Sequence, residues 1–124
     1  MNAADESAPA RGDVMWLQLD PQAGHEQGGT RPVLVLSPEA YNRLTGLAIV
    51  CPITSKAKGY PFEVPIPAGA ATTGVVLADQ IKSLDWRSRR GQFKERLDAE
   101  VVNDVVARTL ALIDPDEVFG TSSA

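Results

Sequence analysis

The stretch Asp20–Pro38 reads DPQAGHEQGGTRPVLVLSP and divides by composition into two parts. Residues 20–30 carry glycine and proline at close intervals and no apolar run, which predicts a loop. Pro32 then opens a short run of valine and leucine, the pattern of a buried strand. Functional groups often lie on a loop held by a rigid strand. We therefore expect a binding or catalytic site at this junction, which carries His25, Glu26, Gln27, Thr30 and Arg31.

Around this stretch, short apolar or alternating segments punctuated by glycine and proline predict a series of β-strands. Pro61 and Pro65 suggest that one of these strands lies at an edge or is bent. The predicted strands cover residues 13–19, 32–36, 47–53, 60–66 and 75–81, with a further short strand pair at 84–87 and 92–96 around Gly91.

Two helices are predicted as well. Ser37 as N-cap, followed by Pro38 and Glu39, starts a short helix that Gly46 ends. Asp98 can cap a longer helix with a single apolar stripe, formed by Val101, Val102, Val105, Val106, Leu110 and Ile113. Short strands followed by one long helix indicate an α+β fold, mainly β, in which the helix lies on a small barrel.

The 124 residues and their 44% apolar content indicate one domain, at residues 11–113, between a disordered tail at 1–10 and a flexible tail at 114–124. No apolar run is long enough to cross a membrane and no leader opens the chain, so we expect a soluble, cytoplasmic protein. One histidine and one cysteine cannot supply the usual zinc ligands, and no metal or other cofactor is expected. The single cysteine, Cys51, lies in an apolar run and is expected in the core.

The net charge of −4 is unevenly distributed along the chain. Asp5, Glu6 and three acids at 114–117 belong to the tails, whereas residues 82–96 carry six basic residues against two acidic ones. A concentrated positive face is what a phosphate backbone would contact. The sequence therefore predicts a basic stripe from Lys82 onward.

A series of short motifs runs along the chain. In order, they are Gly12-Asp13-Val14 with Trp16, Asp20-Pro21, Gly24-His25-Glu26-Gln27, Thr30-Arg31-Pro32, Ser37-Pro38, Pro52-Ile53-Thr54, Lys58 through Val64, Ala78 through Ser83, and Trp86-Arg87-Ser88-Arg89. This ordered set, which covers roughly residues 11–113, resembles the MazF/PemK (Kid) family of toxin endoribonucleases of type II toxin–antitoxin systems, and most closely its MazF-type members.

The resemblance implies an SH3-like barrel of the CcdB/PemK kind, with a short helix after the second strand and a C-terminal helix. It further implies a homodimeric mRNA interferase that arrests growth. Such a toxin cleaves single-stranded RNA at short sequences, without a metal or the ribosome, and leaves 2′,3′-cyclic phosphate and 5′-hydroxyl ends. The implied partner is a MazE-like antitoxin whose acidic, flexible tail occupies the RNA groove. DNA would be contacted only through that antitoxin.

Arg31 and Thr54 match the catalytic positions of the family. In RNA self-cleavage the 2′-hydroxyl attacks the adjacent phosphorus, and negative charge accumulates on the phosphorane. A guanidinium suits that charge, because it presents forked donors and stays ionised at neutral pH. We therefore assign Arg31 first an electrostatic role, although a proton-transfer role has been considered for the matching family residue. Thr54 would donate to a nonbridging oxygen or orient Arg31.

Glu26 and His25 are the expected proton-handling groups. Glu26 would act as base toward the 2′-hydroxyl or orient Arg31, and His25 would act as acid toward the leaving 5′-oxygen. PemK/Kid-type members carry a histidine here and also use an arginine and an aspartate in the fifth strand. Asp79 matches that aspartate, but Leu77 stands at the arginine position. This departure favours a MazF-type site built on Arg31 and Thr54.

The expected RNA contacts combine lysines for the phosphate backbone with amide and guanidinium groups for base edges. They are Lys56, Lys58, Asp79, Gln80, Lys82, Arg87 and Arg89. Trp16 and Trp86 are expected to pack against the barrel or the antitoxin rather than to stack on RNA.

Two other functions remain open at this point. One is a CcdB-like toxin that binds DNA gyrase and has no nuclease activity. The other is an SH3-like interaction domain. CcdB-like chains depend on an aromatic-containing C-terminal tail, whereas this chain ends DPDEVFGTSSA and keeps Arg31 and Thr54. Both alternatives rank below the ribonuclease.

Overall fold

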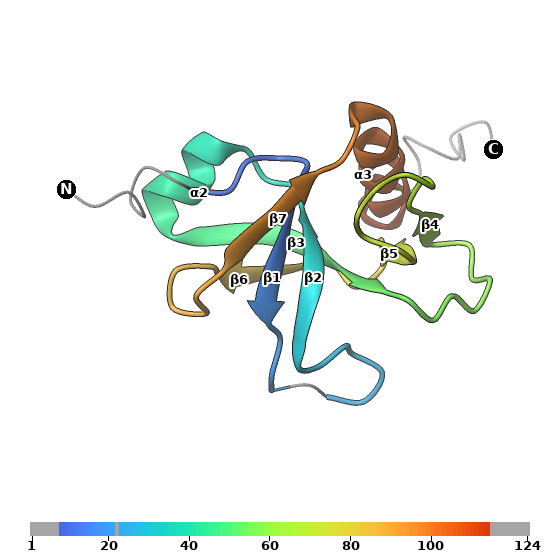
Figure 1. The fold of residues 1–124 in the computed structure, drawn as a ribbon, viewed down its shortest axis with the longest axis horizontal. Helices are drawn as coiled ribbons and strands as arrows, with labels where there is room; N and C mark the ends of the chain where they lie inside the picture. Colours follow the sequence, from blue (N-terminus) through green and yellow to red (C-terminus); the bar gives the residue numbers. More distant parts are fainter. Residues whose placement is uncertain (1–7, 22, 115–124) are drawn as a thin grey trace.

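The described part of the chain forms an antiparallel sheet of seven strands with two helices packed around it (Figure 1). The computed structural model describes residues 8–21 and 23–114. Its elements are β1 (Asp13–Gln18), β2 (Thr30–Val35), α2 (Glu39–Thr45), β3 (Leu47–Thr54), β4 (Glu63–Pro65), β5 (Val75–Leu77), β6 (Lys82–Asp85), β7 (Gln92–Arg96) and α3 (Ala99–Ile113).

The long strand β3 organises the sheet, whose order is β4-β5-β3-β2-β1-β7 with β6 also paired to β3. Leu47–Val50 of β3 pair with β6, whereas Ile53 and Thr54 pair with β5. One strand thus exchanges neighbours along its length. The sheet can therefore curl on itself, as in a small barrel.

Both faces of the sheet are buried, because alternate strand residues enter two separate apolar clusters. Val14, Leu34 and Cys51 belong to the cluster that α3 covers through Val101, Val102 and Val105. Met15, Leu17, Val33, Val35 and Val50 belong to a second cluster that contains Trp86. The prediction that Cys51 is a core residue is confirmed, since its side chain is fully buried.

Three predicted elements differ from the structure. Strands four and five are only three residues long each, because Pro61 precedes β4 and a turn closed by Gln80 N and Leu77 O follows β5. The predicted strand pair around Gly91 is wrong. Strand β6 pairs with β3 and β7 pairs with β1, although Gly91 N still donates to Trp86 O across the turn.

Helix α2 ends at Gly46 as predicted, but Ser37 does not cap it. Pro38 is the N-cap, and no side chain caps the helix. The Ser37 hydroxyl is instead buried, where it donates to Asn42 Oδ1 at 2.5 Å and accepts from Ile49 N at 2.8 Å. Ser37 therefore ties α2 to β3 rather than starting the helix.

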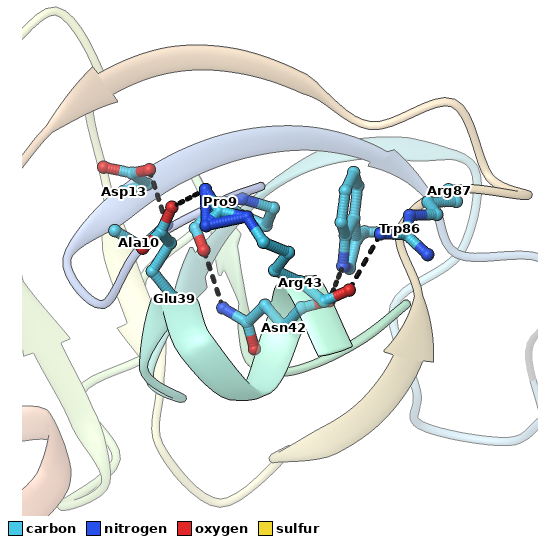
Figure 2. A network of polar contacts seen from close by, with 8 residues as sticks. All are labelled: Pro9, Ala10, Asp13, Glu39, Asn42, Arg43, Trp86 and Arg87. Carbon is cyan, nitrogen blue, oxygen red and sulfur yellow. Dashed lines mark hydrogen bonds and ion pairs between the residues drawn. The ribbon is translucent and has the colours of Figure 1, made fainter. Parts of the chain in front are cut away.

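Asn42, on α2, holds Pro9 against the barrel (Figure 2). The fully buried side-chain amide of Asn42 donates to Pro9 O at 2.8 Å. The main-chain carbonyl of Asn42 accepts from Trp86 Nε1 at 3.0 Å. Residues 8–10 are therefore packed, although we expected them in a disordered tail. Residues 1–7 of that tail and residues 115–124 of the C-terminal tail lie outside the described residues.

The apolar stripe of helix α3 is only partly buried. Asp98 is its N-cap residue, as predicted, but its side chain makes no capping hydrogen bond. Val101, Val102 and Val105 are buried, whereas Leu110 is 41% exposed and Ile113 70% exposed. The predicted single stripe therefore divides into a buried part and an exposed apolar part. Among the described residues, no helix has the length and apolarity needed to cross a membrane.

Candidate functional site

A hollow of about 460 Å³ lies where the β1–β2 loop, the end of β3 and the turn after β5 meet. We call it the polar hollow. It gathers the predicted residues His25, Arg31, Thr54, Lys56, Lys58, Asp79 and Gln80, and its lining is completed by Gln27, Tyr60, Glu63 and Leu77. These residues come from segments distant in sequence, and the sheet topology brings them together.

Arg31 lies near the start of β2, opposite Leu17 of β1. Its Nε donates to Gly28 O at 3.0 Å, which fixes the guanidinium against the end of its own loop. Within the described chain, no hydrogen bond or ion pair occupies its two Nη groups. The forked donors of the guanidinium are therefore available to an anion in the hollow.

Thr54 is the last residue of β3, and its side chain is buried beside the hollow. Its Oγ1 accepts from Lys56 N at 3.1 Å, so the hydroxyl proton remains free to be donated. Gly74 makes this packing possible. A Cβ at Gly74 would lie 2.1 Å from Thr54 O, and its φ of +113° is one that other residues rarely adopt.

The β1–β2 loop presents His25 to the polar hollow but not Glu26. The Glu26 carboxylate accepts from Ala23 N at 3.1 Å, and Glu26 N donates to Ala23 O. Glu26 thus closes a turn within the loop and does not line the hollow. Both side chains remain exposed.

Gln80 is bound to the main chain of the same loop. Its Oε1 accepts from Gln27 N at 3.2 Å, and its Nε2 donates to His25 O at 3.2 Å. Both ends of the amide are therefore engaged by the segment that carries His25. The RNA contact predicted for Gln80 stays a prediction, and in this structure its side chain is bound to the loop.

The predicted basic stripe over residues 82–96 does not line the polar hollow. Arg87 donates to Arg43 O on α2, and Arg89 donates to Gln18 O and Asp20 O at the base of the loop. Lys82 lies on β6 and does not line the polar hollow. No other basic residue between 82 and 96 lines it either. The positive charge at the polar hollow comes instead from Arg31, Lys56 and Lys58.

Tyr60 and Glu63 are among the residues of the polar hollow that were not predicted as site residues. The Glu63 carboxylate accepts from Lys58 N and Gly59 N, and so it shapes the loop that carries both lysines. The motif Lys58 through Val64 contained the signal. An acid a few residues after a Lys-Gly turn can accept from the amides of that turn.

Helix α3 contacts the loops on both sides of the polar hollow. Thr109 Oγ1 donates to Ala78 O at 3.0 Å, next to Asp79. Arg108 donates to Pro61 O, next to Tyr60, and pairs with Asp104. One helix therefore supports two walls of the site.

Burial and hydrogen bonding shift the pKa values of Cys51, Glu95 and Asp85. Burial raises the pKa of the Cys51 thiol to about 12. Hydrogen bonds from Thr72, opposed in part by burial, lower the pKa of Glu95. The amide of Ser88 likewise lowers the pKa of Asp85.

Comparison with known proteins agrees with this architecture. Residues 10–113 match the family of PemK-like, MazF-like toxins of type II toxin–antitoxin systems. The endoribonuclease toxin MazF of Escherichia coli (strain K12) is 44% identical over 105 residues, which is 85% of this chain and 94% of that protein.

Solved structures give the same result. The crystal structure of MazF from Deinococcus radiodurans superposes with a TM-score of 0.83 at 55% identity, covering 86% of this chain and 96% of that one. MazF in a MazE–MazF crystal structure from that organism superposes with a TM-score of 0.78, also at 55% identity, with the same coverage.

The fold and the polar hollow together define a small, helix-covered β-barrel with a cationic site at the junction of its loops. The chain belongs to the PemK-like, MazF-like family of type II toxins. The predicted fold class, a mainly-β barrel with a short helix after the second strand and a C-terminal helix, is confirmed.

Proposed function

We propose that this chain is a toxin endoribonuclease that cleaves single-stranded RNA at short sequences, without a metal or the ribosome. The observation that carries the proposal is the meeting of Arg31, Thr54, Lys56 and Lys58 in one hollow. These groups can hold a phosphodiester and stabilise charge that develops on it. The family membership and the endoribonuclease name of the Escherichia coli relative support the same activity.

In the proposed reaction the RNA 2′-oxygen attacks its own 3′-phosphorus and the bond from phosphorus to the 5′-oxygen breaks. The products are a 2′,3′-cyclic phosphate and a 5′-hydroxyl. The Nη donors of Arg31 would bind the nonbridging oxygens as their charge grows, and the Thr54 hydroxyl would donate to one of them. Both groups are already oriented by their contacts to Gly28 O and Lys56 N.

Proton transfer is assigned by position in the hollow. His25 lines it and suits donation to the leaving 5′-oxygen. Two carboxylates, Asp79 and Glu63, line the hollow. Glu63 is engaged by the amides of Lys58 and Gly59, so Asp79 is the candidate to accept the 2′-proton. Glu26 is held in a turn of its loop, and its role is then to orient the segment that carries His25 and Arg31.

Lys56 and Lys58 are exposed on the β3–β4 loop and are proposed to contact the phosphate backbone. Such contacts carry no sequence information but make binding salt-dependent. Lys82, Arg87 and Arg89 are not proposed as contacts in the hollow, because they lie elsewhere in the fold.

A homodimer is proposed through the exposed apolar part of α3. A second hollow of about 460 Å³ there is almost wholly apolar, and its lining includes Tyr41, Ile81, Leu110 and Ile113. Exposed apolar patches of this kind mark interaction sites. Sedimentation velocity of Leu110→Asp should show a smaller species than the parent. Leu44→Asp, at an 84% exposed leucine on α2 outside this hollow, should leave the size unchanged.

The proposed protein partner is a MazE-like antitoxin, because the Deinococcus radiodurans MazF has been crystallised with MazE. DNA contact would follow only through that antitoxin, and the proposed compartment is the cytoplasm. A gyrase-binding function is not favoured, since it gives no role to the polar hollow.

The direct test is incubation of the purified protein with long single-stranded RNA in EDTA. We expect discrete cuts from the parent and none from Arg31→Ala. Arg90→Asn is the matched control. It removes an exposed guanidinium outside the polar hollow, at a φ of 54° that asparagine tolerates. Absence of cuts by the parent, or equal cutting by Arg31→Ala, would refute the proposed endoribonuclease function.

A further inference from the structure

A further hollow, smaller than the polar hollow and distinct from the apolar hollow at α3, adjoins Arg31 on the side away from Thr54. It has a volume of about 290 Å³ and is lined by Trp16, Arg31, Pro32, Ile53, Ser55, Ala71, Thr72, Thr73 and Lys94. We call it the tryptophan hollow. None of the predicted RNA-binding residues lies in it.

The two hollows meet at Arg31, and the end of β3 divides them. Thr54 lines the polar hollow, whereas its neighbours Ile53 and Ser55 line the tryptophan hollow. This follows from strand geometry, because successive side chains point to opposite sides. Arg31 lines both. A phosphodiester held by Arg31 would therefore have its two flanking nucleotides next to different hollows.

Trp16 gives the tryptophan hollow an aromatic surface. It lies opposite Pro32 in the β1–β2 pair and is 38% exposed, whereas Trp86 is buried. Lys94 Nζ lies 5.7 Å from the centroid of the Trp16 ring, within the range of a cation–π contact. The indole stays exposed with that contact made, so it retains surface on which a planar group can stack.

Lys94 is fixed in place rather than loose. Its Nζ donates to Thr72 Oγ1 at 2.7 Å and lies 3.9 Å from Glu95 Oε2. The Glu95 carboxylate in turn accepts from Ala71 N and Thr72 N. The hydroxyls of Ser55 and Thr73, both exposed, have no hydrogen-bond partner among the described residues. The hollow thus combines a held cation, an aromatic face and free hydroxyls.

We propose that the tryptophan hollow is a nucleotide subsite, in which the base next to the scissile phosphate stacks on Trp16 while Lys94 attracts the adjoining phosphate. This assignment rests on the proposed ribonuclease function. Stacking on an exposed aromatic and attraction by a fixed lysine are how single-stranded nucleic acid is held. A second cation beside Arg31 favours a polyanionic strand over an apolar peptide side chain.

The test pairs a protein change with a substrate change. Cuts are first mapped on long RNA, and a short RNA carrying one mapped site is then made with an abasic nucleotide either just 5′ or just 3′ of the cut. Trp16→Ala should lower kcat/KM on the intact RNA by roughly 5- to 150-fold, as expected for one lost base stack. Trp16→Phe should retain most of the activity.

The decisive readout is the coupling between the two changes. For the parent, removing the base on one side of the cut should lower kcat/KM. For Trp16→Ala, removing the same base should lower kcat/KM little further, because this variant already lacks the stacking contact. Lys94→Gln should weaken binding and reduce its salt dependence. Circular dichroism melts identify any variant that fails to fold. If Trp16→Ala does not fold, kcat/KM of Trp16→Phe and Lys94→Gln is measured on the same abasic substrates instead.

The outcomes separate the two proposals. A parent that makes no cuts overturns the ribonuclease function and this subsite with it. A parent that cuts while Trp16→Ala cuts equally well overturns the subsite alone. Independent losses from Trp16→Ala and from both abasic substrates also overturn it. If Trp16→Ala keeps full RNA cleavage but escapes inhibition by the antitoxin, the hollow belongs to a protein interface and the subsite is refuted.

Discussion

Replacing Gln80 with alanine should loosen the loop that carries His25 without removing any group that we assign to chemistry. The Gln80 side chain is held by Gln27 N and His25 O, each at 3.2 Å. These two hydrogen bonds join the turn after β5 to the β1–β2 loop across the polar hollow. Alanine deletes both of them and leaves the main chain of the loop unchanged.

The expected size follows from the two bonds. Each contributes about 0.5–1 kcal/mol net, because water replaces it when the loop opens. Together they contribute about 1–2 kcal/mol, which shifts the balance between closed and open loop by roughly 5- to 30-fold. The value of kcat/KM for RNA cleavage should therefore fall by at most about 30-fold, far less than the complete loss expected for Arg31→Ala.

Two assays are needed, cleavage of an RNA with a mapped site and hydrogen exchange of the Gln27 amide. The amide should exchange faster in Gln80→Ala. In Gln80→Glu the carboxylate can still accept from Gln27 N but no longer donates to His25 O. Gln80→Glu should therefore protect the Gln27 amide and lose only part of the activity. Gln92→Ala, at an exposed glutamine on β7, is the matched control.

Unchanged exchange of the Gln27 amide in Gln80→Ala would refute the positioning role. If exchange is unchanged and the cut sequence shifts, Gln80 contacts a base, as its residue type first suggested. If exchange rises and cleavage does not fall, the loop need not be closed for catalysis.

Three further predictions concern the rest of the fold. Asn42→Ala removes the amide bonds to Pro9 O and to Ser37 and should lower the free energy of unfolding by about 2–4 kcal/mol in urea titrations; a loss below about 1 kcal/mol would contradict its anchoring role. The Glu95 pKa is lower in the folded chain than its ordinary value of 4.5, so its contribution to stability is present above pH 4.5 and is lost as the pH falls through the folded pKa. Urea midpoints of Glu95→Gln should accordingly decline less steeply below pH 4.5 than those of the parent, and parallel curves would argue against this. Cys51, with a pKa of about 12, should react with a thiol reagent at pH 8 only on unfolding, and immediate labelling of the native protein would show that the core opens readily.

Sequence patterns predicted those elements whose signals are local. The apolar run at residues 47–53 and the glycine that ends α2 correspond closely to β3 and to Gly46. The partners of β6 and β7 were not predictable in the same way. A short strand shows which of its residues are apolar, but not which distant strand it will pair with. The turn at Gly91 looked like a hairpin for that reason.

The site shows the same division between local and distant information. The family resemblance singled out Arg31 and Thr54, and the fold brings both to one hollow. Residue type did not predict that the side chains of Gln80 and Arg89 bind main-chain atoms at the β1–β2 loop. Main-chain acceptors leave no trace in sequence, because every residue carries one. A site role for Lys94 was not predicted for a related reason, because only the folded sheet brings this lysine beside Trp16.

The position of α3 has an evolutionary consequence. This helix donates to Ala78 O and Pro61 O on two walls of the polar hollow, and it also carries the exposed Leu110 and Ile113. We therefore expect substitutions on the exposed side of α3 to change the spacing of these walls as well. Under the proposed function, choice of binding partner and choice of substrate are then coupled through α3 as the sequence diverges.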